Sequence, residues 1–219
     1  MTPNKYTEFI SSPQGRAYLN TIRYAEGTAG PKGYNTIFGY DYFDDFSKHP
    51  NVVNRSGGYA SAAAGAYQFM PNTWGMAQKA LNLSDFGPKN QDLAAAYLID
   101  QRYPIEKIMQ GDAVFEQVIP TLAPEWASLP TKEGVSYYNQ PVRSMDSLKN
   151  TYLGSFNNEP AGMGSVKAPI KNVKTKNTEQ EVRKNFLQKM IFQQLMGPLD
   201  NRKINPLQNL NLHNPFSLF

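Results

Sequence analysis

The spacing of apolar residues predicts a helix that begins near Ser12 and ends near Gly27. Serine followed by proline, here Ser12-Pro13, is typical of a helix start, because serine caps free backbone N–H groups and proline fits the first helical position. Apolar residues then recur at spacings of four and three, at Tyr18, Ile22 and Ala25. Gly27 suits the left-handed conformation that closes many helices. We therefore expect Glu26 at the C-terminal end of this helix, beside its apolar face.

The pattern changes after this helix and then becomes helical again. Residues 30–60 are rich in Gly, Tyr, Asn and Asp, and the β-prone residues 34–38 predict a small hairpin. Further helices are expected near 71–82, over about 88–102 with Leu93, Ala96 and Tyr97 facing inward, from Asp112, and from Pro141. The predicted class is α+β: a mostly helical domain with a small β-hairpin region beside the expected cleft.

The last third of the chain has a different composition. Residues 155–177 are rich in Gly, Pro, Asn and Lys without periodicity, which predicts a linker. Residues 178–181 form a capping box, and an apolar stripe follows at Val182, Phe186, Leu187, Met190, Ile191 and Leu195. The predicted organisation is one folded domain over 1–154, a linker over 155–177, and a docking helix with a tail over 178–219.

Composition limits the possible chemistry. The chain has 219 residues, of which 40% are hydrophobic and 18% are charged, so it can form a packed domain with an appendage. It has no cysteine and only two histidines, His49 and His213, which argues against thiolate chemistry and a multi-histidine metal site. We expect neither a metal nor another cofactor. No long apolar run is present, and Met1–Lys5 precedes no apolar core, so we expect no membrane span and no secretory signal.

The net charge of +4 comes from the tail. Residues 1–154 hold 13 basic and 14 acidic residues, whereas residues 155–219 hold nine and four. A basic tail can contact nucleic acid or an acidic protein surface, and a solvated linker is the alternative.

Glu26 is the strongest candidate for catalysis. A general acid needs a carboxyl group whose pKa is raised, so that it holds a proton near neutral pH. Burial disfavours the charged form, and the partial negative charge at a helix C-terminus acts in the same direction. The alternative is an exposed glutamate in the last helical turn, which is where most glutamates lie.

Six short blocks, in order along the chain, are similar to the phage lambda endolysin family. They are Glu26–Thr28 and the segments 33–39, 43–50, 64–68, 85–92 and 126–130. The resemblance covers about residues 10–153. It implies a lysozyme-like fold and a metal-free lytic transglycosylase that cleaves the β-1,4 bond between N-acetylmuramic acid and N-acetylglucosamine. The product would carry a 1,6-anhydro-muramyl end, and Glu26 takes the catalytic position.

Such a reaction needs a single carboxyl group. Glu26 would protonate the departing oxygen and then accept the proton of the muramyl C6 hydroxyl, which attacks C1 within the same molecule. Hydrolytic lysozymes and other glycosidases use two carboxylates instead. A second carboxylate would come from Asp41, Asp44 or Asp45; for the Asp44-Asp45 pair, a surface turn is the alternative.

Several residues are candidates for substrate binding. Tyr67 and Gln68 are expected to hydrogen-bond sugar hydroxyl and acetamido groups, and Gly65 to let the backbone approach the glycan. For Tyr67 and Trp126, a place in the core is the alternative. His49 precedes Pro50 and is expected in a turn rather than as a proton carrier. The remaining predicted substrate contacts are Tyr34, Ile37, Trp126, Tyr138 and Gln140.

The apolar stripe after residue 181 predicts a partner surface. We therefore expect a phage virion component, in the tail or inside the particle, that is made in the host cytoplasm. It would dock through residues 178–219 onto tail or internal virion proteins and open the bacterial wall, from the periplasm, during genome entry. A free endolysin released at host lysis, and a structural tail protein with a vestigial lysozyme domain, are the alternatives.

Overall fold

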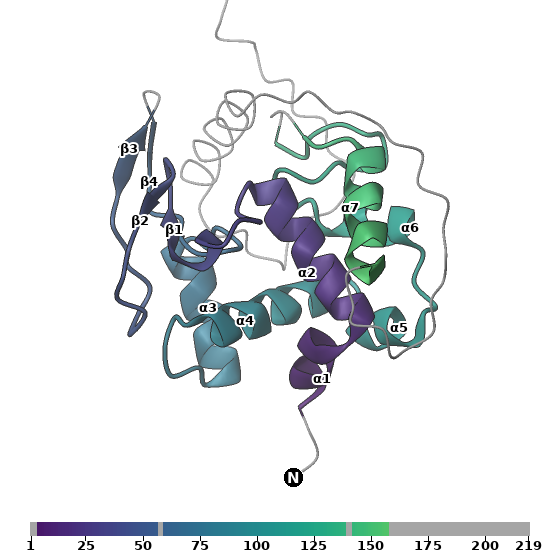
Figure 1. Cartoon of the computed structure of the whole chain (residues 1–219), viewed down its shortest axis with the longest axis horizontal. Coiled ribbons are helices and arrows are strands. Elements are labelled where there is room, and N and C mark those ends of the chain that lie inside the picture. Colours follow the sequence, from purple (N-terminus) through teal and green to yellow (C-terminus); the bar gives the residue numbers. More distant parts are fainter. Residues whose placement is uncertain (1–3, 57–58, 139–141, 158–219) are drawn as a thin grey trace, which may run out of the picture.

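The computed structural model describes residues 4–56, 59–138 and 142–157 (Figure 1). The last helix, α7 (Met145–Asn157), continues past the predicted domain boundary at residue 154, and the Ser155 hydroxyl donates to the Thr151 carbonyl oxygen within it. The rest of the predicted linker and the docking helix, with its stripe from Val182 to Leu195, lie outside the described residues.

Helix α2 (Pro13–Glu26) runs through the middle of the helical part, and α7 packs along it (Figure 1). Its predicted start and end are both confirmed. The Ser12 hydroxyl accepts a hydrogen bond from the Gly15 backbone N–H at 3.0 Å, and Gly27 has a φ of 75°. Tyr18, Ile22 and Ala25 are buried, as their spacing predicted. The C-terminal end of α2, which carries Glu26, points toward the strands.

The other helices are α1 (Lys5–Ser11), α3 (Pro71–Leu81), α4 (Pro88–Asp100), α5 (Ile105–Gln110) and α6 (Phe115–Leu122). Of these, α1, α4 and α5 pack against α2, and α3 packs against α4. The predicted starts at Pro71 and Pro88 are confirmed. The inward face of α4 is formed by Ala94–Ala96, Leu98 and Ile99, while Leu93 and Tyr97 are only partly buried.

Two helix starts differ from the prediction, and two short helices were not predicted. Asp112 does not open α6, because its backbone N–H bonds to the Lys107 carbonyl oxygen and so completes the end of α5. Helix α7 begins at Met145 rather than at Pro141, and the Ser144 hydroxyl accepts a hydrogen bond from the Ser147 N–H in its first turn. Helices α1 and α5 span only two turns or less, too short for apolar periodicity to show.

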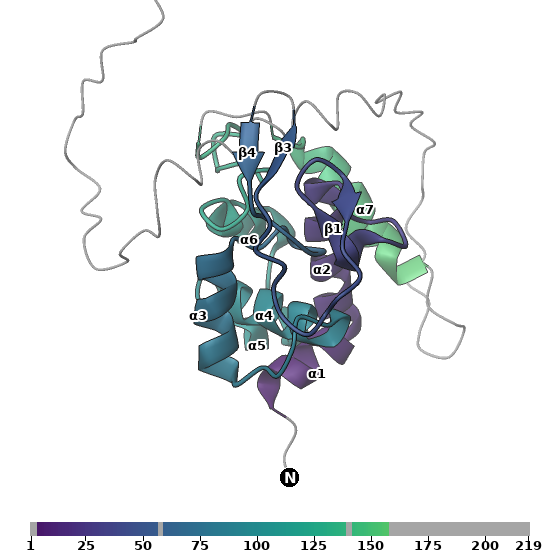
Figure 2. The ribbon, with the colours of Figure 1, turned by 90° about the vertical axis from the view of Figure 1, so that its left-hand side faces the viewer.

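The strands form two small antiparallel hairpins to one side of the helices (Figures 1 and 2). In the predicted hairpin, β1 (Thr36–Ile37) pairs with β2 (Asp41–Tyr42), with Thr36 opposite Tyr42. A second hairpin, not predicted, pairs β3 (Asn54–Ser56) with β4 (Tyr59–Ser61). A short 3-10 helix, η1 (Gly33–Asn35), leads into β1. The α+β class is therefore confirmed. Among the described residues, no helix is both long and apolar enough to cross a membrane.

Candidate active site

Glu26 is buried at the end of α2, with 1% of its surface exposed. The Ser128 hydroxyl, 102 residues later in the chain, donates a hydrogen bond to Glu26 Oε1 at 2.7 Å. This burial excludes the alternative of a solvated glutamate in the last turn. The predicted position of Glu26 beside the apolar face of α2 is confirmed.

The chain directly after Glu26 is tied to the turn at residues 64–69. After the left-handed Gly27, the buried Thr28 hydroxyl donates to the Ala66 carbonyl oxygen. Ala64 and Phe69 exchange backbone hydrogen bonds of 3.0 and 2.8 Å, which close the turn. Because of these bonds, the end of α2 and the turn hold each other in place.

Gly65 is required by the packing inside this turn. It has a φ of 80°, and a Cβ atom on it would lie 2.3 Å from Gln91 Oε1. That oxygen accepts the Ala66 N–H at 2.8 Å, and the Gln91 amide nitrogen donates to the carbonyl oxygens of Tyr34 and Phe86. The buried Gln91 therefore connects α4, η1 and the turn, which explains the glycine without a bound glycan.

A partly buried carboxylate, Asp92, joins the same three elements. Its Oδ1 accepts hydrogen bonds from the Tyr67 hydroxyl at 2.6 Å and the Tyr34 hydroxyl at 2.9 Å. Burial raises the pKa of Asp92, although the two phenols oppose this, and it raises the pKa of Tyr34 to about 12 and that of Tyr67 well above its usual value. Both phenols therefore stay protonated donors. The Arg23 guanidinium lies over the Tyr34 ring, 4.6 Å from its centroid.

Most of the predicted substrate contacts lie beneath the protein surface. Trp126 Nε1 lies 3.3 Å from the Tyr67 carbonyl oxygen, and the Tyr138 hydroxyl donates to the Pro124 carbonyl oxygen at 2.6 Å. Gln140 lies outside the described residues. Burial favours the core alternative for Tyr67 and Trp126, and direct sugar contact by these side chains stays a prediction. The buried members of the set are Ile37, Gly65, Tyr67, Gln68, Trp126 and Tyr138.

Gln68 differs from these residues because one of its polar atoms is unsatisfied. Its Nε2 donates to the Gly65 carbonyl oxygen at 2.8 Å, and its φ is 48°. Its Oε1 is buried and has no hydrogen-bond partner within the part of the chain that the structure describes. A buried acceptor without a partner costs stability, and a donor that reached this oxygen would recover that cost.

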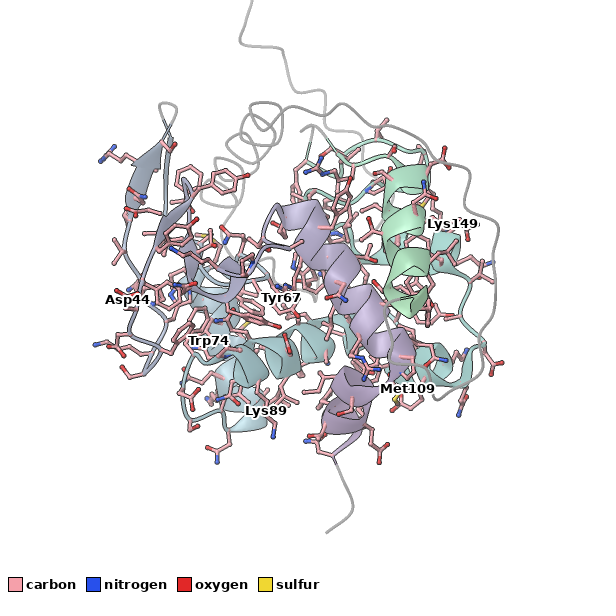
Figure 3. All side chains as sticks on the ribbon, viewed as in Figure 1. Asp44, Tyr67, Trp74, Lys89, Met109 and Lys149 are labelled. Carbon is pink, nitrogen blue, oxygen red and sulfur yellow. The ribbon has the colours of Figure 1, made fainter. Side chains whose placement is uncertain are left out.

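The candidate second carboxylates are exposed. Asp41, Asp44 and Asp45 all face solvent. Asp45 accepts the Ser47 backbone N–H at 2.8 Å and its hydroxyl at 2.9 Å, which lowers the Asp45 pKa. Figure 3 shows Asp44 at the outer edge of the molecule and Tyr67 near its centre. The surface-turn alternative therefore describes the Asp44-Asp45 pair.

His49 is a buried structural residue. Its Nε2 lies 2.9 Å from the Phe69 carbonyl oxygen, and its Nδ1 accepts the Asn51 N–H at 3.0 Å. These partners require the neutral ring with the hydrogen on Nε2, and burial lowers the His49 pKa. The expected turn role, rather than proton transfer, fits this geometry. Within the described ranges, no group of three or more His, Asp or Glu residues could hold a metal ion.

Ser128 contacts Glu26, although no role was predicted for it. It lies in the segment 126–130, which contributed to the family resemblance, but nothing in its spacing connects it to Glu26. The contact arises only because the loop after α6 folds back over the end of α2.

Comparison with known proteins gives a consistent family match. The Endolysin family model matches residues 16–156, so the match ends one residue before the end of α7. The endolysin of Escherichia phage lambda is 36% identical over 142 residues, which cover 62% of this chain and 86% of that relative.

Solved structures show the same likeness in three dimensions. A bacteriophage lambda lysozyme complexed with a chitohexasaccharide superposes with a TM-score of 0.58 at 31% identity, covering 65% of this chain and 94% of its own. Another structure of lysozyme from bacteriophage lambda gives a TM-score of 0.55 at 29% identity with the same coverage.

Proposed function

Because the chain belongs to the endolysin family, we propose that it cleaves the glycan strands of peptidoglycan, with Glu26 as the catalytic acid. The observation that carries this proposal is the burial of Glu26 at the end of α2, where Ser128 holds one of its oxygens. The related lambda lysozyme in complex with a chitohexasaccharide supports an N-acetylated glycan as the ligand.

We further propose that the reaction is that of a lytic transglycosylase. Protonated Glu26 donates its proton to the glycosidic oxygen as the bond from C1 to that oxygen breaks. The resulting carboxylate takes the proton of the muramyl C6 hydroxyl, whose oxygen bonds to C1 and forms the 1,6-anhydro ring. Glu26 ends the cycle protonated, and no water is consumed.

The surroundings of the other carboxylates support a single catalytic group. Asp41, Asp44 and Asp45 are exposed. Asp92 accepts two phenols, and Glu125 accepts the Arg102 guanidinium at 2.6 Å. A hydrolase would need one of these groups to activate a water molecule opposite Glu26.

Replacing Glu26 with glutamine tests the catalytic role. We expect Glu26→Gln to lower the rate of wall clearance by about 10² to 10⁴, the usual contribution of a general acid. The double variant Asp44→Asn/Asp45→Asn should retain the wild-type rate. Undiminished activity in Glu26→Gln would refute the proposal.

Mass spectrometry of the muropeptide ends made by the wild-type protein then distinguishes a lytic transglycosylase from a hydrolytic lysozyme. Anhydro-muramyl ends support the transglycosylase, and reducing ends identify a hydrolytic lysozyme.

For substrate contact, we propose that Gln68 Oε1 accepts an N–H or O–H of a bound sugar. Its lack of a partner among the described residues supports this role. Tyr67, Trp126 and Tyr138 contribute in this proposal by fixing the shape of the surface on which the glycan lies.

We also propose that the protein is carried in a phage particle through residues 178–219. The support is the apolar stripe in the sequence, which would otherwise face water. Protein inventories of purified particles would test it, using the charged variant Phe186→Glu/Ile191→Glu and, as control, Asn185→Glu, which lies opposite the centre of the stripe on the predicted helix. The protein should be absent from particles only when the stripe is charged. Absence of the wild-type chain from particles would favour a free endolysin.

A further inference from the structure

Ser128 is a polar neighbour of Glu26 that the reaction above does not use. Its hydroxyl lies 2.7 Å from Glu26 Oε1, within the range of a charge-assisted hydrogen bond. Glu26 is almost fully buried and Ser128 is partly buried. A serine hydroxyl has one hydrogen to donate, and the observed contact directs it to Oε1.

The position of the Ser128 hydroxyl is fixed by its loop. Trp126, two residues earlier, is buried and donates to the Tyr67 carbonyl oxygen at 3.3 Å. The Ser128 carbonyl oxygen accepts the Arg143 backbone N–H at 3.0 Å, and the next residue, Leu129, is fully buried. The loop is thus held on both sides of Ser128, by the turn at residues 64–69 and by the segment before α7.

We propose that Ser128 is a positioning residue for Glu26, which keeps the transferable proton on Oε2 and stabilises the carboxylate left after that proton has gone. This inference rests on the proposed role of Glu26 as the acid. When Glu26 is protonated, Oε1 is the carbonyl oxygen that accepts from Ser128, so the proton resides on Oε2. When Glu26 is ionised, the same hydrogen bond becomes charge-assisted and stronger.

The hydrogen bond therefore favours the ionised form of Glu26 over the protonated form. Its removal should let Glu26 keep its proton to higher pH and should weaken Glu26 as the base in the second step.

Other charged and titratable groups lie on the elements around Glu26. They are Arg23 and Tyr24 on α2, Tyr67 in the turn, Asp92 on α4, Glu125 paired with Arg102, and Arg143 over the Tyr24 ring. A Ser128→Ala substitution leaves all of these groups in place, so a changed pH profile reports the hydroxyl itself.

The experiment is the pH dependence of initial rates of wall digestion by the full chain. We expect Ser128→Ala to move the alkaline limb of the profile upward by about one pH unit and to lower the maximal rate roughly tenfold. Ser128→Thr, which keeps a hydroxyl, should restore both. The matched control is Ser11→Ala, at an exposed position on α1 near the other end of α2, and it should behave like the wild type.

A Ser128→Ala enzyme whose alkaline limb stays at the wild-type pH would overturn the inference, even if the enzyme were slower. Full activity of Glu26→Gln would instead refute the proposed function, so the two failures can be told apart. If thermal melts show that Ser128→Ala does not fold, Ser128→Cys provides a side chain of similar size with a weak donor. The Glu26 titration is then followed directly by carbon NMR of labelled carboxyl groups, and an unchanged midpoint in the cysteine variant contradicts the proposal.

Discussion

Trp126 Nε1 donates a hydrogen bond to the carbonyl oxygen of Tyr67, 3.3 Å away, although 59 residues separate them in the chain. The contact joins the loop that carries Ser128 to the turn that follows β4. Because both residues are buried, it is shielded from competition by water. Glu26, the proposed catalytic residue, and the predicted sugar-binding turn are therefore parts of one connected structure.

Substitution of Trp126 by phenylalanine tests this connection. The ring bulk is largely kept, while the buried Tyr67 carbonyl oxygen loses this donor, so we expect a stability loss of about 1–3 kcal/mol in urea unfolding. Wall digestion should also slow severalfold, because the Ser128 loop loses its anchor. Trp74→Phe, which trims a buried indole in α3, controls for lost ring volume and should leave the rate nearly unchanged. Equal effects of both variants on the rate would argue against the connection.

A methyl group at Gly65 should disrupt the turn. The added Cβ would lie 2.3 Å from Gln91 Oε1, and the φ of 80° is strained for alanine. We expect Gly65→Ala to lose more than about 2 kcal/mol of unfolding free energy in chemical denaturation. The control is Gly75→Ala on the exposed side of α3, where nothing lies within 4 Å, and it should gain about 0.5–1 kcal/mol. A stable, inactive Gly65→Ala protein would instead favour the close backbone approach to glycan.

Removal of the Tyr67 hydroxyl distinguishes its two possible roles. If the phenol serves the partly buried Asp92 carboxylate, Tyr67→Phe should cost about 1.5–3 kcal/mol of stability near neutral pH, because a charged acceptor loses a donor. The concentration of wall substrate at half-maximal rate should then change little. Unchanged thermal stability together with weaker substrate binding would show that the hydroxyl contacts the sugar.

His49 should make the protein sensitive to mild acid. Its folded-state pKa lies below the ordinary value of 6.5, mainly because of burial, so the native state binds fewer protons than the unfolded state. The stability that this gives is present above pH 6.5 and is lost as pH falls through the lower, folded pKa. Urea unfolding at pH 7.5 and 5.5 should therefore show a smaller loss for His49→Gln than for the wild type. The matched variant His213→Gln should keep the wild-type difference.

Short-range sequence patterns were sufficient to predict the helix ends that position the site. Ser12-Pro13 and Gly27 mark both ends of α2 through capping chemistry that acts within a few residues, and thus place Glu26. Pro71 and Pro88 mark two further helix starts for the same reason. Apolar spacing on α2 placed Glu26 beside the buried face but left an exposed glutamate in the last turn as the alternative, and the structure excludes that alternative.

The partners of the site residues could not be read from such signals. Ser128 reaches Glu26 across 102 residues, and the Asp92 carboxylate collects Tyr34 and Tyr67 from two other elements. These contacts depend on how helices and loops pack, and no short-range pattern encodes them. The same limit explains why Tyr67 and Trp126, both plausible sugar contacts by residue type, are buried with internal partners.

The first helix lies outside the family match, which starts at residue 16, yet it is fastened to the rest of the molecule. Phe9 is completely enclosed, and Lys5 Nζ lies 2.7 Å from Asp100 Oδ2 at the far end of α4. A protein trimmed to the matched residues would lose Phe9 and leave a cavity where its ring packs. It would also leave the Asp100 carboxylate without its Lys5 partner. In Figure 1, α1 lies at the foot of the helical part, remote from the end of α2 that carries Glu26. A label on the exposed surface of α1 is thus expected to leave the proposed site accessible.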